Sequence, residues 1–155
     1  MNLNDALTLI LSSIKNFPKV ELVHTTESLG RILAIDLKSK NNIPSFDNSQ
    51  VDGYAVNSGD SFSKTFSISQ RIPAGSNTVP LLRGTTARIF TGAMVPKNSD
   101  AIVMQEDIKL IQGRIKFSKK IKAGQNIRKK GSDLKKNQTF FKKGRFLSAA
   151  DVGMC

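Results

Sequence analysis

The sequence has few of the residues on which many reactive sites depend. It contains one histidine, His24, one cysteine, Cys155, one tyrosine and no tryptophan. A single histidine excludes a metal site built from several histidines. A single cysteine cannot close an internal disulfide, so the sequence predicts a reducing, cytoplasmic location. Without tryptophan, any platform for stacking nucleic-acid bases would have to depend on the phenylalanines.

Long apolar runs are also missing. No stretch approaches the roughly 18 consecutive apolar residues of a membrane-spanning helix. The first ten residues, MNLNDALTLI, lack the basic region of a secretory signal, so we expect neither a membrane span nor secretion. The 155 residues, 39% of them hydrophobic, are enough for one ordinary domain or two small ones with a modest core.

Positive charge is abundant and unevenly distributed. The sequence has 24 Lys and Arg against 12 Asp and Glu, and 14 of these bases lie between Asp107 and Phe146 with only two acids. Such a segment attracts polyanions. One interpretation is therefore a basic β module that binds nucleic acid, with Phe117, Phe140, Phe141 and Phe146 stacking on bases. The alternative is that these phenylalanines are core positions and that the lysines form a solvated face.

The N-terminal residues have the periodicity of an amphipathic helix. Asn4 is the expected N-cap, and the segment Asn16-Phe17-Pro18 should end the helix because proline disfavours helix at the residue before it. Because no second long helix is available, we expect residues 1–16 to pack on a domain missing from this chain. The expected apolar stripe consists of Ala6, Leu7, Ile10, Leu11 and Ile14.

A second helix begins close to the last residue. Ser148 has the position of an N-cap, and Asp151 follows three residues later, as in a capping box. A helix of about one turn does not stand alone. We therefore expect the chain to be the N-terminal piece of a longer protein.

Between the helices, short apolar segments alternate with glycine and proline turns, which is typical of an all-β arrangement. The fold class expected is α+β, mostly β. A barrel-like or bifurcated β sub-domain would span residues 40–136, and residues 17–39 with 137–155 would form a smaller, incomplete, linker or dimerisation type of sub-domain. The expected strands lie at residues 19–25, 31–37, around 56, 66–68, 87–90, 101–104, 125–128 and 139–141, with a hairpin at 108–117 turning at Gln112-Gly113.

The segment PSFDNSQVDGYAV carries two aspartates. Asp52 and Gly53 favour a turn with positive φ at the glycine, which would present the Asp52 carboxylate beside exposed backbone N–H groups. Asp47 and Asn48 would instead bond their own backbone and hold the loop. The alternative is that both aspartates only make such local turns.

Two further segments have polar residues at expected strand ends. In IFTGAMVP, the Thr91 hydroxyl beside Gly92 is placed to reach a phosphate or a metal-bound water, or is simply a strand threonine. In QNIRKKGSD, Arg128 can clamp a phosphate with two hydrogen bonds. The alternative for that segment is a solvated basic loop in which the acid, Asp133, relieves repulsion.

Taken together and in order, these motifs resemble those of the molybdopterin molybdenumtransferases, the family that includes the gephyrin E domain. The motifs are SLGRILA, FDNSQVDGYAV, RIFTGAMVP, AIVMQE and GQNIRKKGSD. The resemblance extends over about residues 3–154. It implies an enzyme that inserts molybdate into adenylylated molybdopterin and releases AMP, with Mg²⁺ as the divalent cation. It also implies a homodimer, with molybdopterin adenylyltransferase as the upstream donor and without membrane or specific nucleic-acid partners. Relatives of gephyrin also serve in assembly, so a scaffold or dimerisation module is a further alternative.

The resemblance implies roles for residues of the motifs. Asp52, Thr91 and Asp133 match active-site positions, and Asp52 and Asp133 would handle the metal or molybdate. In the family the active cleft lies between the β sub-domain of one subunit and a catalytic domain of its partner, so this chain alone is expected to be inactive. The sequence departs from the family at Ser132, where the family usually has an acid, at Gln50, where it more often has a small residue, and at Ser45, where proline or glycine is common. The residues expected to bind substrate anions are Arg128, Gly53, Gly92 and Ser49.

Overall fold

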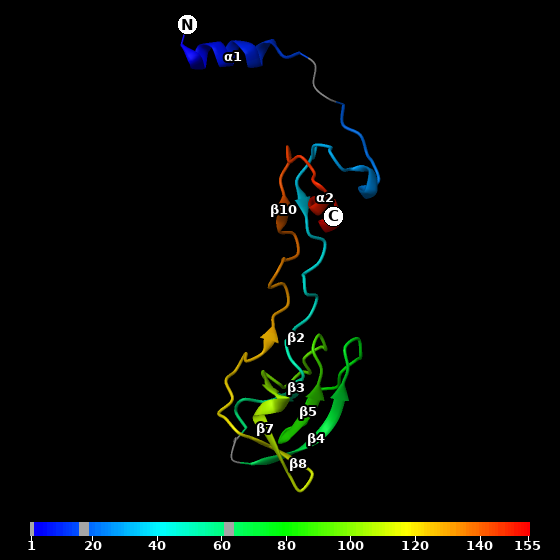
Figure 1. Ribbon diagram of the computed structural model, residues 1–155, viewed down its shortest axis with the longest axis vertical. Coiled ribbons are helices and arrows are strands. Elements are labelled where there is room, and N and C mark those ends of the chain that lie inside the picture. Colours follow the sequence, from blue (N-terminus) through cyan, green and yellow to red (C-terminus); the bar gives the residue numbers. More distant parts are fainter. Residues whose placement is uncertain (1, 16–18, 61–63) are drawn as a thin grey trace. The chain divides into compact units, whose positions relative to one another are not determined.

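The computed structural model describes residues 2–15, 19–60 and 64–155 (Figure 1). Contacts within the chain divide it into two compact units. The first combines Met1–Leu37 with Phe141–Cys155, and the second is Lys38–Phe140. In the described part of the chain, no helix has the length and apolar character needed to cross a membrane.

The first unit begins with helix α1 (Leu3–Ser13). Its N-cap is Asn2, not Asn4 as the sequence predicts. The Asp5 N–H donates to Asn2 Oδ1 at 2.9 Å, and the Asn2 N–H donates to Asp5 Oδ2 at 3.3 Å, which completes a capping box. If the helix were capped by Asn4, Leu7 would be the residue that has to accept the N-cap backbone N–H, and a leucine side chain has no hydrogen-bond acceptor. The expected end of this helix, at residues 16–18, lies outside the described residues.

The apolar stripe of α1 is exposed. The side chains of Leu7, Ile10 and Leu11 are 53, 60 and 59% exposed. No described residue of the chain therefore covers this face of the helix.

The strands expected at residues 19–25 and 31–37 are mostly absent. The first stretch is irregular and leads into the 3₁₀ turn η1 (Thr25–Glu27). In the second, only Leu37 belongs to a strand, β1 (Leu37–Lys38), which pairs with β10 (Thr139–Phe141). Val20 and Leu22 are 79 and 102% exposed. Alternation defines a strand only where a partner covers one face, and these side chains have no such cover.

The C-terminal helix α2 (Ala149–Met154) confirms the cap predicted at Ser148. The Asp151 N–H donates to Ser148 Oγ at 3.3 Å, and the Ser148 N–H donates to Asp151 Oδ2 at 3.0 Å. Arg145 donates to Asp151 Oδ1 at 2.7 Å while its guanidinium stacks over the Phe141 ring, 4.4 Å from the centroid. The bond from Arg145, followed by those from the Ser148 N–H and hydroxyl, lowers the pKa of the buried Asp151 to about 2.

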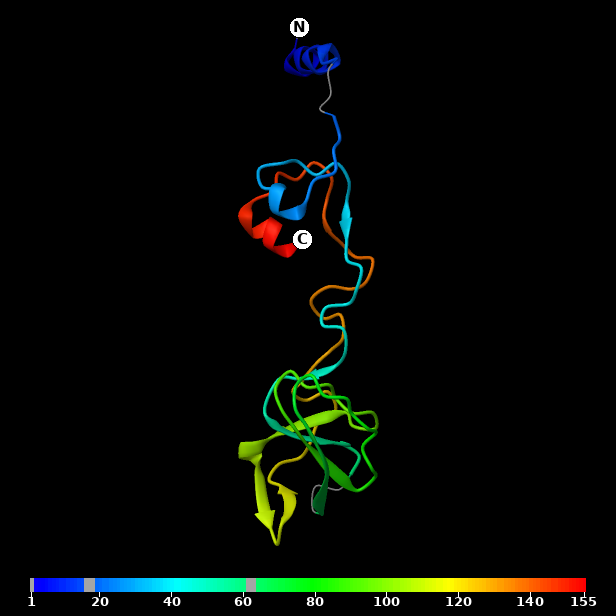
Figure 2. The same ribbon diagram turned by 90° about the vertical axis from the view of Figure 1, so that its right-hand side faces the viewer.

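The larger unit is built on a six-stranded sheet in the order β6-β3-β5-β4-β8-β7, which curls on itself (Figures 1 and 2). Neighbouring strands run antiparallel except for β4 and β5. The hairpin predicted around Gln112-Gly113 is confirmed, with both turn residues at positive φ. The elements are β3 (Gly53–Val56), β4 (Thr65–Ile72), β5 (Thr85–Ile89), β6 (Ala101–Met104), η2 (Gln105–Asp107), β7 (Ile108–Ile111) and β8 (Arg114–Phe117).

Both faces of this sheet are buried at β3 and β6. Successive residues of β3, Ala55 and Val56, belong to two different apolar clusters, as do Ile102 and Val103 of β6. Successive side chains of a strand point to opposite faces, so one cluster lies on each side of the sheet. The predicted fold class, mostly β with an N-terminal helix, is therefore confirmed, and the two-sided core leaves the strand ends and their loops to form any site.

Candidate functional site

Three segments meet beside the sheet to form a small cleft. Strand β2 (Asn48–Ser49) pairs antiparallel with β9 (Ile127–Arg128), with Asn48 opposite Arg128. The loop after β5 joins them, because the Gly92 N–H donates to the Ser49 carbonyl at 2.8 Å and the Ser49 N–H donates to the Ala93 carbonyl at 3.0 Å. Ser49 is 1% exposed and its hydroxyl donates to the Val51 carbonyl at 2.6 Å. Ser49 therefore holds these segments together.

The cleft has a volume of about 350 Å³. Four of the residues expected from the sequence to bind anions or act in catalysis lie together in its lining. The sequence does not predict the other two, Asn48 and Gln50, as lining residues. The lining residues are Asn48, Ser49, Gln50, Thr91, Gly92 and Arg128.

Asp52 is not one of the lining residues, but it contacts Thr91, which is. The backbone N–H and the hydroxyl of Thr91 both donate to Asp52 Oδ1, at 2.9 and 2.8 Å. These two bonds, with the charge of Arg88, hold the pKa of Asp52 below its ordinary value, so the carboxylate is ionised at neutral pH. No described residue donates to its second oxygen, Oδ2, which is left for a ligand.

Arg88 is a neighbour of Asp52 that the sequence reasoning missed. Its guanidinium donates to the Gly53 carbonyl at 3.0 Å and to Gln105 Oε1 at 2.5 Å, and it stacks over the rings of Tyr54 and Phe90, at 5.2 and 4.6 Å. The signal was present, because Arg88 belongs to the same RIFTGAMVP motif as Thr91. Because two hydrogen bonds and two aromatic rings fix its guanidinium, Arg88 provides a positive charge at a constant position near Asp52.

The two glycines of the expected site have different roles. Gly53 does not have the positive φ predicted for it and is instead a buried residue of β3. A Cβ at this position would lie 2.1 Å from the Val103 carbonyl oxygen, so glycine is required by the close approach of β6. Gly92 does have a positive φ, 81°, and turns the loop that lines the cleft.

Arg128 reaches the cleft from β9 and forms an ion pair with Asp133. The Ser132 hydroxyl donates to the other carboxylate oxygen of Asp133 at 3.0 Å. Both partners of the pair remain accessible, with side chains 50 and 41% exposed. Arg128 is thus available to an anion that replaces Asp133, whereas both oxygens of Asp133 already have donors.

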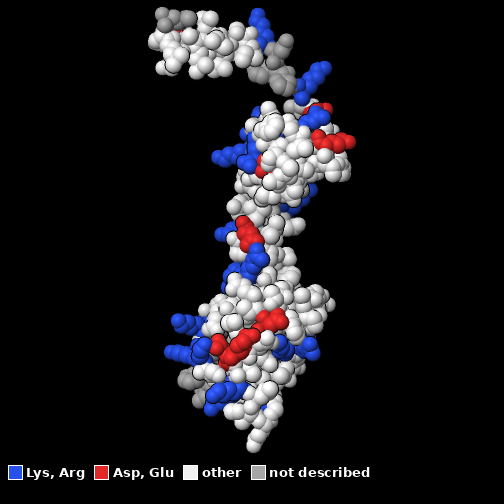
Figure 3. Space-filling model, viewed as in Figure 1, with Lys and Arg blue, Asp and Glu red and all other residues white. Residues whose placement is uncertain are grey.

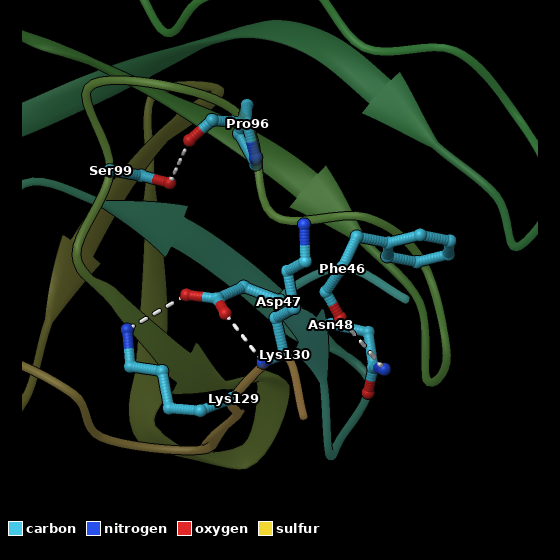
Figure 4. A network of polar contacts seen from close by, with 7 residues as sticks. All are labelled: Phe46, Asp47, Asn48, Pro96, Ser99, Lys129 and Lys130. Atoms are coloured by element: carbon cyan, nitrogen blue, oxygen red, sulfur yellow. Dashed lines mark hydrogen bonds and ion pairs between the residues drawn. The ribbon is translucent and has the colours of Figure 1, made fainter. Parts of the chain in front are cut away.

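Asp47 does not bond its own backbone as predicted. Its Oδ1 accepts the Lys130 N–H at 2.7 Å and its Oδ2 pairs with Lys129 Nζ at 2.8 Å (Figure 4). The local bond was expected because aspartate favours such turns, but the fold brings the Lys129 ammonium group and the Lys130 backbone N–H close to the carboxylate instead, and the bond to Lys129 is charge-assisted. Asn48 does make a local bond, from Nδ2 to the Phe46 carbonyl at 3.5 Å.

The described residues contain no group of three or more His, Cys, Asp or Glu side chains that could hold a metal ion by themselves. Mg²⁺ is usually bound through one or two carboxylates, with substrate phosphates and water completing the shell. The ionised Asp52 carboxylate, with one oxygen left for a ligand, fits one position of such a shell. Asp133 fits less well because Arg128 and Ser132 occupy it.

The phenylalanines of the basic segment are divided between core and surface. Phe117 and Phe141 are only 2 and 6% exposed, so the core interpretation is confirmed for these two, whereas Phe146 is 64% exposed. On the face drawn in Figure 3, basic side chains of the larger unit lie beside acidic ones and do not form a continuous basic surface. Neither observation favours a base-stacking platform.

Comparison with known proteins places these motifs in a family. The model of the MoeA N-terminal region (domain I and II) matches residues 1–155. The chain is 38% identical over 155 residues to molybdopterin molybdenumtransferase of Haemophilus influenzae, covering 98% of this chain and 38% of that protein. It is 30% identical to gephyrin of Dictyostelium discoideum, covering 97% of this chain and 23% of gephyrin.

A solved structure agrees with these sequence matches. The crystal structure of the molybdopterin biosynthesis MoeA protein from Pyrococcus horikoshii superposes with a TM-score of 0.86 at 35% identity, over 99% of this chain and 41% of that one. The chain thus spans about two fifths of the length of these bacterial and archaeal relatives. With the family model matching the whole sequence, the chain belongs to the MoeA family and corresponds to its N-terminal region.

Proposed function

We propose that this chain is the N-terminal region of a molybdopterin molybdenumtransferase, which inserts molybdate into adenylylated molybdopterin and releases AMP during molybdenum cofactor biosynthesis. The relative from Haemophilus influenzae has the name of this enzyme. The observation that carries the proposal is the cleft itself, where Thr91 and Arg128 line one space and each is bonded to an aspartate, Asp52 or Asp133.

The chemistry of the cleft suits anionic substrates. Molybdate and the phosphates of the adenylylated substrate are anions, which bind guanidinium groups and backbone N–H groups. Arg128 would bind such an anion through its guanidinium, and Gly92 allows the backbone to come close to it. Asp133 would keep Arg128 oriented at the cleft until the anion replaces it.

Asp52 would hold the divalent cation. The two bonds from Thr91 keep its carboxylate ionised and fixed, while Oδ2 is left for Mg²⁺. When bound there, Mg²⁺ would supply Lewis-acid stabilisation of negative charge on the adenylate phosphate. Arg88 would keep the Asp52 segment in place through the Gly53 carbonyl.

The remaining parts of the proposal concern partners. The chain would act in the cytoplasm as part of a homodimer, with molybdopterin adenylyltransferase supplying its substrate. The second wall of the cleft would come from the catalytic domain of the partner subunit. The 155 residues by themselves would therefore release no AMP.

The test uses the protein expressed from its complete coding sequence, supplied with adenylylated molybdopterin, molybdate and Mg²⁺. AMP release and cofactor formation are expected for the wild type, and Asp52→Asn is expected to lower both about 100-fold because it removes the charge that holds the metal. Asp107→Asn is the matched control, since Asp107 pairs with Lys119 whereas Asp52 is bonded to the lining residue Thr91. An inactive wild type would refute the function, whereas an active Asp52→Asn variant would refute only the role of Asp52.

A further inference from the structure

Asp47 connects the segments that build the cleft without lining the cleft itself. Its carbonyl accepts the Val95 N–H at 2.9 Å, which ties it to the loop after β5. Its carboxylate bonds Lys129 and Lys130, at 2.8 and 2.7 Å, which ties it to the basic loop, residues 128–131 (Figure 4). One residue therefore joins three parts of the chain that are far apart in sequence.

Arg128 is held on both sides by this arrangement. On the β2 side, Asn48, the residue after Asp47, is paired with Arg128 in the β2–β9 ladder. On the other side, Asp47 fixes the backbone N–H of Lys130, two residues after Arg128. We propose that Asp47 is a positioning residue, which holds the backbone of the basic loop so that the Arg128 guanidinium faces an anionic ligand in the cleft.

The charges explain why the basic loop needs such an anchor. Arg128, Lys129 and Lys130 are three successive cations, which repel one another. Asp133 balances the charge of the Arg128 guanidinium, and Asp47 balances the charge of Lys129 and accepts the Lys130 backbone N–H. Partial burial raises the pKa of Asp47, but the bonds and charges of Lys129 and Lys130 lower it by more, so Asp47 remains ionised at neutral pH.

A purely structural role predicts a different outcome from a positioning role. The Asp47–Lys129 pair is exposed, and exposed ion pairs contribute little to stability. A purely electrostatic role would make Asp47 unfavourable for anion binding, so its neutralisation would tighten binding. A positioning role has the opposite sign, because Arg128 would lose its orientation when the carboxylate is lost.

The experiment measures binding of AMP by calorimetry to the protein from its complete coding sequence, a ligand choice that rests on the proposed function. Asp47→Asn and Lys129→Met are each expected to raise the Kd for AMP about tenfold, since charge-assisted bonds from Arg128 are weakened. The double variant should be no weaker than the worse single variant, because both break the same contact. The KM for adenylylated molybdopterin should rise in parallel while kcat stays within about twofold.

Asp107→Asn and Lys119→Met are the matched controls, since they break an exposed 2.7 Å ion pair outside the cleft lining. Unchanged or tighter AMP binding by Asp47→Asn, or an equal loss in the controls, would overturn the positioning role. A wild type that makes no cofactor but binds AMP with the expected dependence on Asp47 would refute the proposed function alone. A wild type with neither property would overturn both.

Discussion

Replacing Gly53 by alanine tests whether the site depends on the close approach of β3 and β6. The added Cβ would lie 2.1 Å from the Val103 carbonyl oxygen and 2.9 Å from its carbon, whereas such contacts normally begin near about 3.3 Å. The strands would have to separate by about 1 Å at a position buried in the sheet, at a cost of about 3 kcal/mol. Alanine also lowers the conformational entropy of the unfolded chain, which offsets about 1 kcal/mol of this cost. The net loss of unfolding free energy is therefore about 2 kcal/mol.

Urea denaturation followed by far-UV circular dichroism measures this loss, and in thermal melts the Tm should fall by about 6 °C. Gly153→Ala is the control, because a Cβ at Gly153 meets nothing within 4 Å and alanine is the better helix former in α2. We expect Gly153→Ala to be neutral or slightly stabilising. If Gly53→Ala is as stable as the wild type, the argument that glycine is required at this position is wrong.

Two further predictions concern carboxylates. Asp151 has a pKa of about 2 in the folded chain against an ordinary 3.8, so its stabilising effect should be complete above about pH 4 and be lost as the pH falls towards 2. Thermal melts of the wild type should show this loss and melts of Asp151→Asn should lack it; equal acid sensitivity of the two would contradict the assignment. Thr91→Val removes one of the two bonds to Asp52, so the pKa of Asp52 should rise towards its ordinary value, measured by NMR titration of its side-chain carboxyl carbon. An unchanged pKa would mean that the hydroxyl does not stabilise the Asp52 carboxylate.

The sequence correctly predicts features whose interactions join residues only a few positions apart. The Gln112-Gly113 turn and the Ser148 cap depend on neighbouring residues only, and both are present. The N-cap of α1 is also local, but the prediction of Asn4 is wrong, because the cap depends on the reciprocal bond between Asn2 and Asp5. The strand expected at residues 31–37 is wrong for a different reason, since an apolar run does not reveal whether a partner strand exists.

Among the site residues, those in recognisable motifs are predicted from the sequence, whereas those defined by tertiary packing are not. Thr91 and Arg128 were found through motifs, and both line the cleft. Arg88 and Gln50 were missed, although both lie within the quoted motifs, because their contribution depends on which segments pack together. The actual partners of Asp47 lie 82 and 83 residues away, so no reading of its neighbours in sequence would have identified them.

The sequence by itself determined the family motifs, the mostly β class, the hairpin and the polar residue types that an anion site requires. Only the tertiary structure decided that Asp47 is bonded to the basic loop, that Gly53 is glycine because of Val103, and that Asp52 has one carboxylate oxygen committed to Thr91. The physical reason is distance along the chain. Capping and turn formation depend on residues a few positions apart, whereas the charge partner of a carboxylate or the space for a Cβ depends on segments that folding brings together.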